Sequence, residues 1–432
     1  MFSVRVNMPR QEMDGFGVCL AFHQAGMLKK HPKCDEVLDL LFDTAGTSIL
    51  RNIVGDGGIW GDDTNGPIPT IEPEEGVWEF DVDHEQVWAA REAAKRGCNQ
   101  VMATAWSPPY WMKTNACVHD GGELREDKYQ AFAEYLSAYV RSWKEHFGIE
   151  LMAISPANEP DLVTKYSSCI WSGEQYLKFV RDYLGPVFEK DQIQAKVIMP
   201  EPTSCVAHVE DYTDLIFADE AATKVVDIVG LHGYGHDSVI APVRGAAEHG
   251  KKVWQTELCD INVMEEWQRG DDIVNGIFWA KNIHDYLSAM EVSAYIYFWG
   301  TSIYPNGGNL VAIDMETGEI KVPKRLYTFG NYARYVRPGY QRVTVYGTDT
   351  ETHVDAFLSP ANDELVMVTT NPLDREATFY VDLPGLEVKG IRAVRTSATE
   401  DLAEITPAAL DDKGRMKETL PPMSVTTWIL KL

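Results

Sequence analysis

The sequence has few of the features that mark metal-binding, disulfide-linked or membrane-spanning proteins. Its seven cysteines include no C-x-x-C pair and their number is odd, which argues against a zinc knuckle and against a disulfide framework. No apolar run approaches the roughly 18 residues of a membrane-spanning helix. The N-terminus, Met1 to Val6, alternates in polarity like a strand and lacks the apolar core of a signal peptide. We therefore expect a cytoplasmic protein, or a secreted one if a leader has been removed.

Positive charge is also scarce. Lys and Arg together number 39 against 65 Asp and Glu, so the formal net charge is -26. A surface of this charge repels phosphate backbones and anionic lipids, so we expect neither nucleic acid nor membrane as a partner. A neutral or weakly charged ligand is favoured. Hydrophobic residues make up 45% of the chain, which is enough for a large core.

An alternation of strands and helices predicts a parallel α/β fold from Gly17 to Gly300. Short apolar runs alternate there with longer stretches, most of which have helical periodicity. The stretch from Tyr129 to Phe147, for example, keeps its apolar residues at three- and four-residue steps. Eight strands paired with helices predict a closed (β/α)8 TIM barrel. The predicted strands are Val18–Phe22, Ser48–Val54, Gln100–Trp106, Leu151–Ser155, Lys196–Met199, Val225–Leu231, Lys252–Thr256 and Ala294–Trp299.

After about Pro338 the helical pattern stops and short alternating runs follow. Turn signals such as Asn371-Pro372 separate these runs, which predicts an antiparallel β-sandwich, and the N-terminal Phe2–Val6 run suits the same sheet. The predicted domains are an N-terminal strand at 1–13, the barrel at 14–335 and the sandwich at 336–432. The predicted strands of the sandwich are Arg342–Tyr346, His353–Leu358, Leu365–Thr370, Thr378–Leu383, Ile391–Arg395 and Val425–Leu430.

Two glutamates stand at the ends of predicted barrel strands. Glu159 follows the fourth strand and Glu257 ends the seventh. An unpaired buried carboxylate is costly, and the C-terminal ends of barrel strands are where catalytic groups lie. Hydrolysis of a glycosidic bond needs two carboxyl groups, one to protonate the leaving oxygen and one to attack or to activate water. The pair therefore predicts a glycosidase site, in which Asn158 would bind a sugar 2-hydroxyl.

Arg51, on the second predicted strand, would be a buried cation and needs an anionic partner. Glu257 is the natural one, and the pair would keep Glu257 ionised while Glu159, without such a partner, stays protonated. The alternative is an Arg–Glu pair that only braces the barrel.

Aromatic residues cluster at the predicted strand ends and could stack on sugar rings. Taken singly, each is more often a core residue than a ligand platform, and only the clustering favours a binding role. The candidates are Trp60, Trp106, Tyr110, Trp111, Trp171, Tyr234, Tyr297 and Trp299.

The stretch from His232 to His236 follows the sixth strand, and two histidines at this spacing could bind a metal. No obvious motif supplies a third ligand, so we expect no metal and interpret Tyr234 as a hydrogen-bond donor to Glu257. His232 remains a candidate for substrate binding. The glycine-rich 54–58 segment lacks the Lys-Ser/Thr of a phosphate-binding loop, and we interpret it as a tight loop that follows the second strand.

Taken in order, a set of motifs spread over nearly the whole chain resembles glycoside hydrolase family 30, most closely its xylan-active branch. Asn-Glu-Pro alone is shared across the wider clan of barrel glycosidases, whereas the ordered set is specific. The motifs are Asp14-Gly15-Phe16-Gly17-Val18, Ile49-Leu50-Arg51-Asn52, Trp106-Ser107-Pro108-Pro109, Met112-Lys113-Thr114-Asn115, Asn158-Glu159-Pro160-Asp161, Trp254-Gln255-Thr256-Glu257, Asn282-Ile283-His284, the 324–330 and 335–339 segments and the 421–427 segment.

The resemblance implies a barrel with a side β-sandwich and a retaining mechanism, with Glu159 as acid/base and Glu257 as nucleophile. Some xylan-active relatives hold a glucuronate branch through arginine, whereas the loop after the first strand, residues 21–26, contains none here. Lys113 or Arg125 could fold into the site and supply a cation. We therefore expect unbranched substrates to be cleaved at least as well as glucuronate-bearing ones.

The sequence thus predicts a retaining β-glycosidase for β-1,4-xylan or xylo-oligosaccharides that needs no cofactor. The same chemistry on β-1,6-galactan or β-1,6-glucan is the first alternative. A catalytically dead carbohydrate-binding barrel and a metal-dependent hydrolase using His232 and His236 are alternatives of other classes, and the second would lose activity to a chelator. The sequence leaves the oligomeric state and endo or exo action open.

Overall fold

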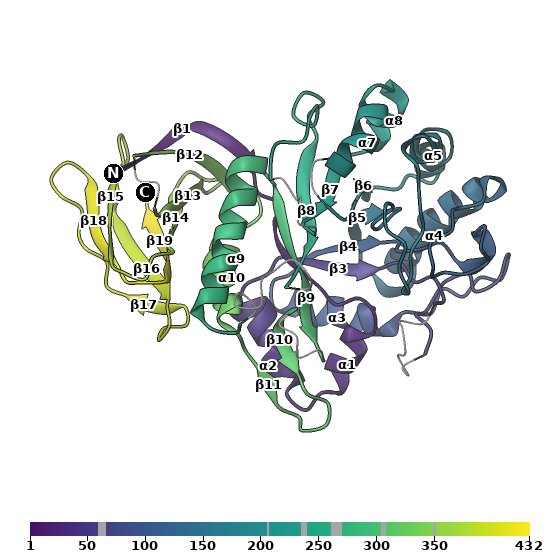
Figure 1. The fold of residues 1–432 in the computed structure, drawn as a ribbon, viewed down its shortest axis with the longest axis horizontal. Helices are drawn as coiled ribbons and strands as arrows, with labels where there is room; N and C mark the ends of the chain where they lie inside the picture. The colour runs from purple at the N-terminus through teal and green to yellow at the C-terminus, as the bar shows by residue number, and fades with distance from the viewer. Residues whose placement is uncertain (59–65, 205–206, 235–239, 261–269, 304–307, 349–350) are drawn as a thin grey trace.

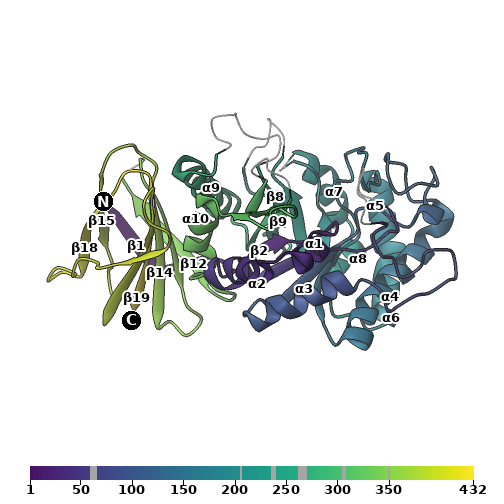
Figure 2. The ribbon, with the colours of Figure 1, turned by 90° about the horizontal axis from the view of Figure 1, so that it is seen from below.

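The chain forms a barrel and a smaller domain of β-strands. The structure, a computed structural model, describes residues 1–432 except 59–65, 205–206, 235–239, 261–269, 304–307 and 349–350. Figure 1 shows the strand domain on the left, the barrel on the right, and helices α9 (Ile273–Asp285) and α10 (Lys324–Ala333) between them. Figure 2 shows the same order from below. The predicted fold class is confirmed.

Eight parallel strands close the barrel. They pair in chain order from β2 to β9, and β9 pairs with both β8 and β2. The first strand ends earlier than predicted, because Phe22 and His23 have φ values of 53° and 62° and turn the chain. The barrel strands are β2 (Gly15–Cys19), β3 (Ile49–Ile53), β4 (Gln100–Thr104), β5 (Leu151–Ser155), β6 (Lys196–Pro200), β7 (Ile228–His232), β8 (Lys252–Leu258) and β9 (Ala294–Ser302).

Helices surround these strands, as the periodicity predicts. Helix α4 spans Tyr129–Phe147, the predicted bounds, and buries its apolar face against the barrel. The other helices are α1 (Gln24–Lys30), α2 (Cys34–Leu38), α3 (His84–Lys95), α5 (Gly173–Phe179), α6 (Gly185–Lys190), α7 (Ala207–Phe217) and α8 (Glu220–Val225). Short π-helical turns are η1 (Asp39–Thr44), η4 (Val180–Leu184) and η6 (Tyr286–Met290), and 3-10 turns are η2 (Tyr110–Met112) and η3 (Glu126–Lys128).

Apolar side chains fill the inside of the barrel, which makes it a packed core rather than a pore. Trp254 is fully buried there, and its indole Nε1 donates to Asp14 Oδ2 at 2.8 Å, near the N-terminal ends of the strands. Lys252 Nζ binds the other oxygen of Asp14 at 2.6 Å. The interior cluster consists of Ile49, Met102, Ala153, Ile198, Ile228, Trp254, Ala294 and Ile296.

The second domain is a nine-stranded sheet that folds back on itself. Its strands are antiparallel to their neighbours except at the parallel contact of β1 with β15. Phe379 on β15 stacks on Trp428 of β19 with ring centroids 5.8 Å apart, so distant strands of the sheet face one another. In the order of pairing, the strands are β17 (Ala403–Ile405), β16 (Gly390–Thr396), β19 (Ser424–Lys431), β14 (Glu364–Asn371), β13 (His353–Leu358), β12 (Gln341–Gly347), β1 (Phe2–Glu12), β15 (Ala377–Asp382) and β18 (Arg415–Leu420).

A buried ionic cluster joins the two domains. Asp355 on β13 is fully buried and accepts hydrogen bonds from His284 on α9 at 2.8 Å and from Tyr332 on α10 at 3.1 Å. Arg342 on β12 donates to the same carboxylate. Burial raises the pKa of Asp355, but His284 and Arg342 outweigh it and lower the pKa below its usual value. The cluster therefore pins the sheet to the helices beside the barrel.

Two strands that the sequence did not predict extend the barrel sheet beyond β9. They are β10 (Asn309–Ile313), which runs parallel to the end of β9, and β11 (Ile320–Lys321), which is antiparallel to β10. Among the helices that the structure describes, none is long and apolar enough to cross a membrane.

Candidate active site

Glu159 and Glu257 come together at the C-terminal ends of the barrel strands. Glu159 follows β5, and Glu257 lies on β8 opposite His232, the last residue of β7. The two side chains are almost buried, at 5% and 4% exposure. One carboxylate oxygen of each glutamate and a ring nitrogen of His232 all lie within 4.8 Å of one another. The sequence placed both glutamates on this face of the barrel, and the structure agrees.

Arg51 lies beneath this pair and makes the predicted contact. Its Nη1 donates to Glu257 Oε2 at 2.6 Å, and its Nη2 donates to Asn158 Oδ1 at 2.9 Å. The guanidinium also lies over the ring of Trp106, 4.4 Å from the ring centroid. Charge-assisted hydrogen bonds and a cation–π contact together hold Arg51 in one orientation.

A third carboxylate, Glu201, shares this arginine, and the sequence analysis missed it. Arg51 Nη2 lies 3.3 Å from Glu201 Oε1, and Thr104 Oγ1 donates to Glu201 Oε2 at 2.9 Å. Glu201 is fully buried, yet the charges of Arg51 and His232 outweigh the effect of burial and lower its pKa to about 2. Glu201 therefore acts as a permanent anion. It follows the fifth barrel strand as Glu159 follows the fourth, so the same sequence signal could have found it.

His232 lies among the three glutamates. Its Nδ1 is 3.1 Å from Glu159 Oε1, and its Nε2 is 3.9 Å from Glu201 Oε1 and 3.8 Å from Glu257 Oε2. Burial lowers the pKa of His232, but the carboxylates, led by Glu257, raise it to about 9. Two cations, Arg51 and His232, thus face three carboxyl groups. The cluster is neutral when one carboxyl group keeps its proton, which is the state that acid catalysis needs.

Burial and neighbouring charges act on the ionisation of Glu257 in opposite directions. Burial raises the pKa of Glu257 above its usual value, against the charges of His232 and Arg51, which lower it. Loss of water on burial and the nearby Glu159 carboxylate raise the pKa, and Arg51, which also contacts Glu201, lowers it. The 2.6 Å contact with Arg51 favours the carboxylate form of Glu257.

Both oxygens of Glu159 have partners. Tyr166 donates from its hydroxyl to Glu159 Oε2 at 3.2 Å, and the Nδ1 atom of His232 contacts Glu159 Oε1.

The backbone is strained at two of the glutamates. Glu159 has a φ of 46° and Glu201 a φ of 55°, in the left-handed region that residues other than glycine rarely adopt. The Glu159 amide donates to the Glu201 carbonyl at 2.8 Å and so links the two strained turns. Strain of this kind, on the order of 1–3 kcal/mol per residue, gathers at functional sites. The sequence carries no periodic signal that marks Tyr166.

Two of the predicted aromatic residues lie beside the carboxylates. Trp106 contacts Phe22 at a centroid distance of 5.1 Å, and Trp299 contacts the same ring at 6.2 Å. Phe22 also contacts Tyr166 at 6.5 Å. These four rings form an aromatic wall that adjoins Arg51 and Glu159, and Phe22 was missed because it was assigned to the first strand.

The other predicted aromatics have mixed positions. Tyr110 is 45% exposed, while Trp111 is half-buried and donates from Nε1 to the Glu72 carbonyl at 3.2 Å. Trp171 packs among helical residues, with Tyr129 at 6.3 Å and Phe179 at 5.2 Å, so the structure places it in the core. An aromatic residue near a predicted strand end can be buried in the core or exposed at the rim of the barrel, and the sequence pattern is the same in both cases.

Tyr234 and Tyr297 do not simply line the rim of the barrel, because both side chains contact other residues of the fold. The hydroxyl of Tyr234 lies 3.4 Å from Cys259 Sγ, so its predicted bond to Glu257 stays a prediction. Tyr297 turns its ring toward Trp279 on α9, with centroids 4.8 Å apart, and so packs outside the barrel. Trp60 and His236 lie outside the described residues.

Two groups of side chains in the described parts of the chain could hold a metal ion. One is Glu159, His232 and Glu257, where His232 is already paired with Glu159. The other, a loop group of Cys117, His119 and Asp120, has donor atoms within 4.8 Å of one another. The pairing of His232 with His236, which the sequence analysis considered and disfavoured as a metal site, involves a residue outside the described part of the chain.

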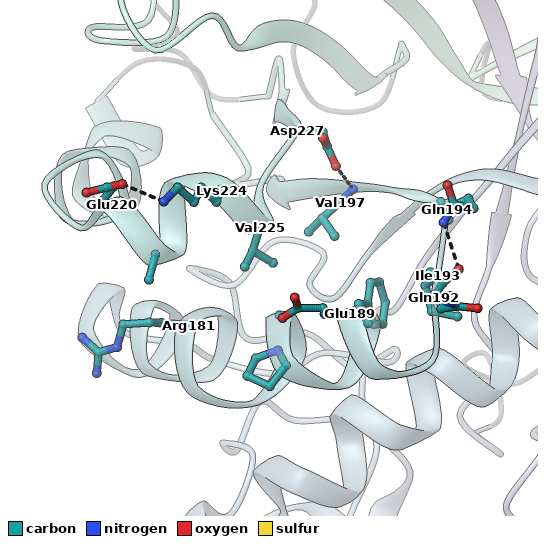
Figure 3. Close-up of a pocket in the computed structure, with 15 residues that line it drawn as sticks. Arg181, Glu189, Gln192, Ile193, Gln194, Val197, Glu220, Lys224, Val225 and Asp227 are labelled. Carbon is teal, nitrogen blue, oxygen red and sulfur yellow. Dashed lines mark hydrogen bonds and ion pairs between the residues drawn. The ribbon is translucent and has the colours of Figure 1, made fainter.

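A hollow of about 1250 Å³ lies at the other end of the barrel, around the starts of β6 and β7 (Figure 3). Asp227 accepts there from the Val197 amide at 2.9 Å, and Lys224 pairs with Glu220 at 2.6 Å. No residue of the carboxylate cluster lines it. Since reaction sites of such barrels lie at the C-terminal ends of the strands, this hollow is not the active site.

Comparison with known proteins agrees with this geometry. A sequence profile of the glycosyl hydrolase family 30 TIM-barrel domain matches residues 80–290. The chain is 27% identical over 359 residues to glucuronoxylanase XynC of Bacillus subtilis. The aligned region covers 81% of this chain and 77% of that protein. The fold of this chain matches that of a glycoside hydrolase family 30 subfamily 8 xylanase from Clostridium acetobutylicum with a TM-score of 0.83 and 26% identity, over 100% of this chain and 99% of the other. The barrel of this chain is therefore similar to the barrel domain of glycoside hydrolase family 30.

These similarities show that the protein is a glycoside hydrolase, and they imply a carbohydrate substrate. The matched region contains Glu159, Glu201, His232 and Glu257, whereas Arg51 precedes it. Family 30 relatives differ in substrate. An endo-1,6-beta-D-glucanase of Trichoderma harzianum is 26% identical over 218 residues, which is 44% of this chain and 42% of that protein.

Proposed function

We propose that this enzyme hydrolyses β-glycosidic bonds with net retention, with Glu159 as acid/base and Glu257 as nucleophile. The observation that supports this most directly is the approach of the two carboxyl groups, since one oxygen of Glu159 lies within 4.8 Å of one oxygen of Glu257. Retaining enzymes hold their two carboxyl groups roughly 5–5.5 Å apart, whereas inverting enzymes leave about 6.5–9.5 Å for a water molecule. The short separation therefore favours direct attack by Glu257.

In the proposed first step, a carboxylate oxygen of Glu257 attacks the anomeric carbon while the Glu159 proton passes to the leaving glycosidic oxygen. The C–O bond to the leaving sugar breaks, and a covalent glycosyl-enzyme forms. In the second step Glu159 takes a proton from water, the resulting oxygen attacks the anomeric carbon, and Glu257 leaves as a carboxylate. Arg51, 2.6 Å from Glu257, stabilises that carboxylate at the start and at the end of the cycle.

Asn158 has a defined orientation that suits contact with the sugar. Its amide oxygen accepts from Arg51 at 2.9 Å, which leaves the amide NH2 group to donate. We propose that it donates to the 2-hydroxyl of the sugar bound beside Glu257, a bond that strengthens as positive charge develops on the ring.

We propose unbranched β-1,4-xylan or xylo-oligosaccharides as the substrate. One relative is a glucuronoxylanase by name and another a xylanase, and both names support the xylan backbone. The loop after β2 offers no unengaged cation for a glucuronate branch, since His23 contacts Glu85 at 3.3 Å and the Gly66 carbonyl at 3.1 Å. Lys113 is buried among main-chain carbonyls, and Arg125 pairs with Asp127 at 2.7 Å. The 1,6-glucanase relative makes β-1,6-glucan the second candidate.

NMR of the first product tests the mechanism, and a substrate panel tests the specificity. With a xylo-oligosaccharide, we expect the β-anomer to appear before mutarotation produces the α-anomer. Early appearance of the α-anomer would exclude retention. Incubation with linear xylan, glucuronoxylan, β-1,6-glucan and β-1,6-galactan, with products separated by size, identifies the glycan and distinguishes endo from exo action. A protein that binds one of these glycans and releases no product would be the dead carbohydrate-binding barrel.

A further inference from the structure

Two loops beside the active site are paired along their backbones. The first, residues 113–124, follows β4 and η2, and the second, residues 161–170, follows β5 and Glu159. The amide of Asp120 donates to the Thr164 carbonyl at 2.8 Å, and the amide of Ser168 donates to the Val118 carbonyl at 2.9 Å. A further bond links Ile170 to Gly122 at 2.8 Å. The position of the second loop therefore depends on the first.

Lys113 lies inside this pair of loops. It is only 2% exposed, and its ammonium donates to the carbonyls of Gly121 at 2.5 Å, of Val118 at 3.5 Å and of Ser168. Two of these carbonyls belong to the first loop and one to the second. An ammonium group has three N–H donors, and these three acceptors match them. Burial lowers the pKa of Lys113, and the three carbonyls are the polar partners that a buried ammonium group requires.

The second loop carries the tyrosine that holds Glu159. Tyr166 lies two residues before Ser168, whose carbonyl binds Lys113. The Tyr166 carbonyl accepts from Thr164 Oγ1 at 3.0 Å, and Ser168 Oγ accepts from the Gly121 amide at 3.0 Å. From this position the Tyr166 hydroxyl donates to Glu159 Oε2 at 3.2 Å. The chain of contacts thus runs from Lys113 through the 161–170 loop to the carboxyl group of Glu159.

We infer that Lys113 is a positioning residue for the general acid, which it serves by holding the loop that aims Tyr166 at Glu159. This inference rests on the proposed role of Glu159. Without the Lys113 ammonium, the Ser168 carbonyl loses its donor, while the Val118 carbonyl keeps only the Ser168 amide and the Gly121 carbonyl only the Asn115 amide group, and the two loops separate locally. Tyr166 then no longer holds Glu159, and proton transfer to the leaving sugar slows. Substrates whose leaving group needs no proton are affected much less.

The test compares kcat/KM on xylohexaose with kcat/KM on a 2,4-dinitrophenyl β-xylobioside, whose leaving group departs without a proton. The variants are Lys113→Met, Tyr166→Phe, the double variant and Glu159→Gln as the reference for a lost acid. Lys165→Met is the matched control, because Lys165 lies on the same loop but its side chain is 92% exposed and pairs with Asp120 on the surface. Thermal unfolding of every variant reports whether it is folded.

We expect Lys113→Met and Tyr166→Phe each to lose about tenfold or more on xylohexaose and less than about threefold on the aryl substrate. On xylohexaose, the kcat/KM of the double variant should fall no further than that of the more impaired single variant. Both changes interrupt the same series of contacts from Lys113 through Tyr166 to Glu159. Lys165→Met should stay within about twofold of wild type on both substrates, as expected for an exposed ion pair.

Equal losses of Lys113→Met on both substrates, or losses that multiply in the double variant, would overturn the inference and leave Lys113 with a purely structural role. If Lys113→Met does not fold, Lys113→Gln, whose amide keeps two N–H donors but lacks the charge and the third donor, is measured by the same ratio of substrates, with the same two outcomes deciding. Should Glu159→Gln itself lose equally on both substrates, the proposed acid role of Glu159 fails, which is distinct from failure at Lys113 alone.

Discussion

Arg51 Nη1 lies 2.6 Å from Glu257 Oε2, and the other end of the same guanidinium lies 3.3 Å from Glu201 Oε1. One buried cation therefore serves two buried carboxylates. Breaking a buried pair by removing one partner leaves an uncompensated charge, which costs far more than the pair contributes. This shared arginine thus connects the stability of the barrel with the ionisation of the proposed nucleophile.

Replacing Arg51 should lower the stability of the folded protein. We expect Arg51→Met to reduce the free energy of unfolding by about 3–5 kcal/mol, because Glu201 and Glu257 are left buried without a cation. Arg375→Met is the control, since Arg375 makes two contacts with Glu351 on the surface, at 58% side-chain exposure, and should cost at most about 1 kcal/mol. Denaturant unfolding measures both. Equal small losses in the two variants would mean that Glu201 and Glu257 are not charged in the folded protein.

Replacing the two proposed catalytic glutamates should abolish activity without unfolding the protein. Glu257→Gln removes the nucleophile, and we expect a loss of several orders of magnitude on every substrate. Glu159→Gln should lose about 10²–10⁴-fold on natural substrates. Azide should partly restore Glu159→Ala on activated aryl glycosides, because a small anion can attack the glycosyl-enzyme without a general base. Glu404→Gln, at an exposed site of the side domain, is the control. Near-normal turnover of either Gln variant on a natural substrate would refute the assignment.

The barrel was predictable because its signals are local. Each strand is a short apolar run, and α4 shows its buried face in the spacing of its apolar residues, so both can be identified without knowing the tertiary contacts. The strands β10, β11, β17 and β18 were missed. Of these, β11 and β17 have only two and three residues, too few for a visible alternation, and their pairing depends on neighbours distant in the sequence.

The site was predictable only in part. Glu159, Glu257 and Arg51 stand out because a charge within an apolar run needs a function or a partner. Glu201 carried the same signal at the end of the fifth predicted strand, between two prolines, and was not singled out. Tyr166 and Phe22 reach the site from loops, and no periodicity reports where a loop side chain points. Trp171 shows the opposite error, because burial in the core and exposure on the rim give the same pattern in the sequence.

Stability should depend on pH through His232. The pKa of His232 rises from 6.5 to about 9 in the folded protein, so its protonated form stabilises the fold. This contribution is fully present below about pH 6.5 and is lost as the pH rises through about 9; a shift of this size corresponds to about 3 kcal/mol. Glu201, with a pKa of about 2, stays ionised across this window and adds no slope.

Denaturant unfolding between pH 6 and pH 9.5 measures this dependence. His232→Asn should flatten the decline over the window, because the titrating imidazole is gone. His84→Asn removes an imidazole at 64% side-chain exposure and should leave the decline as it is in the wild-type protein. An unchanged slope in His232→Asn would show that another group causes the loss of stability.

Linear xylo-oligosaccharides should be cleaved at least as well as glucuronate-bearing ones. An anionic branch needs a fixed cation, because an arginine fork can pair both carboxylate oxygens and offset their desolvation. In the described part of the site Arg51 is engaged by Glu257, Glu201 and Asn158, and Lys113 by main-chain carbonyls, while the net charge of -26 repels an acidic sugar. Comparing kcat/KM on matched linear and glucuronate-substituted oligosaccharides tests this. A preference above about tenfold for the substituted substrate, which corresponds to about 1.4 kcal/mol, would mean that a cation outside these residues binds the branch.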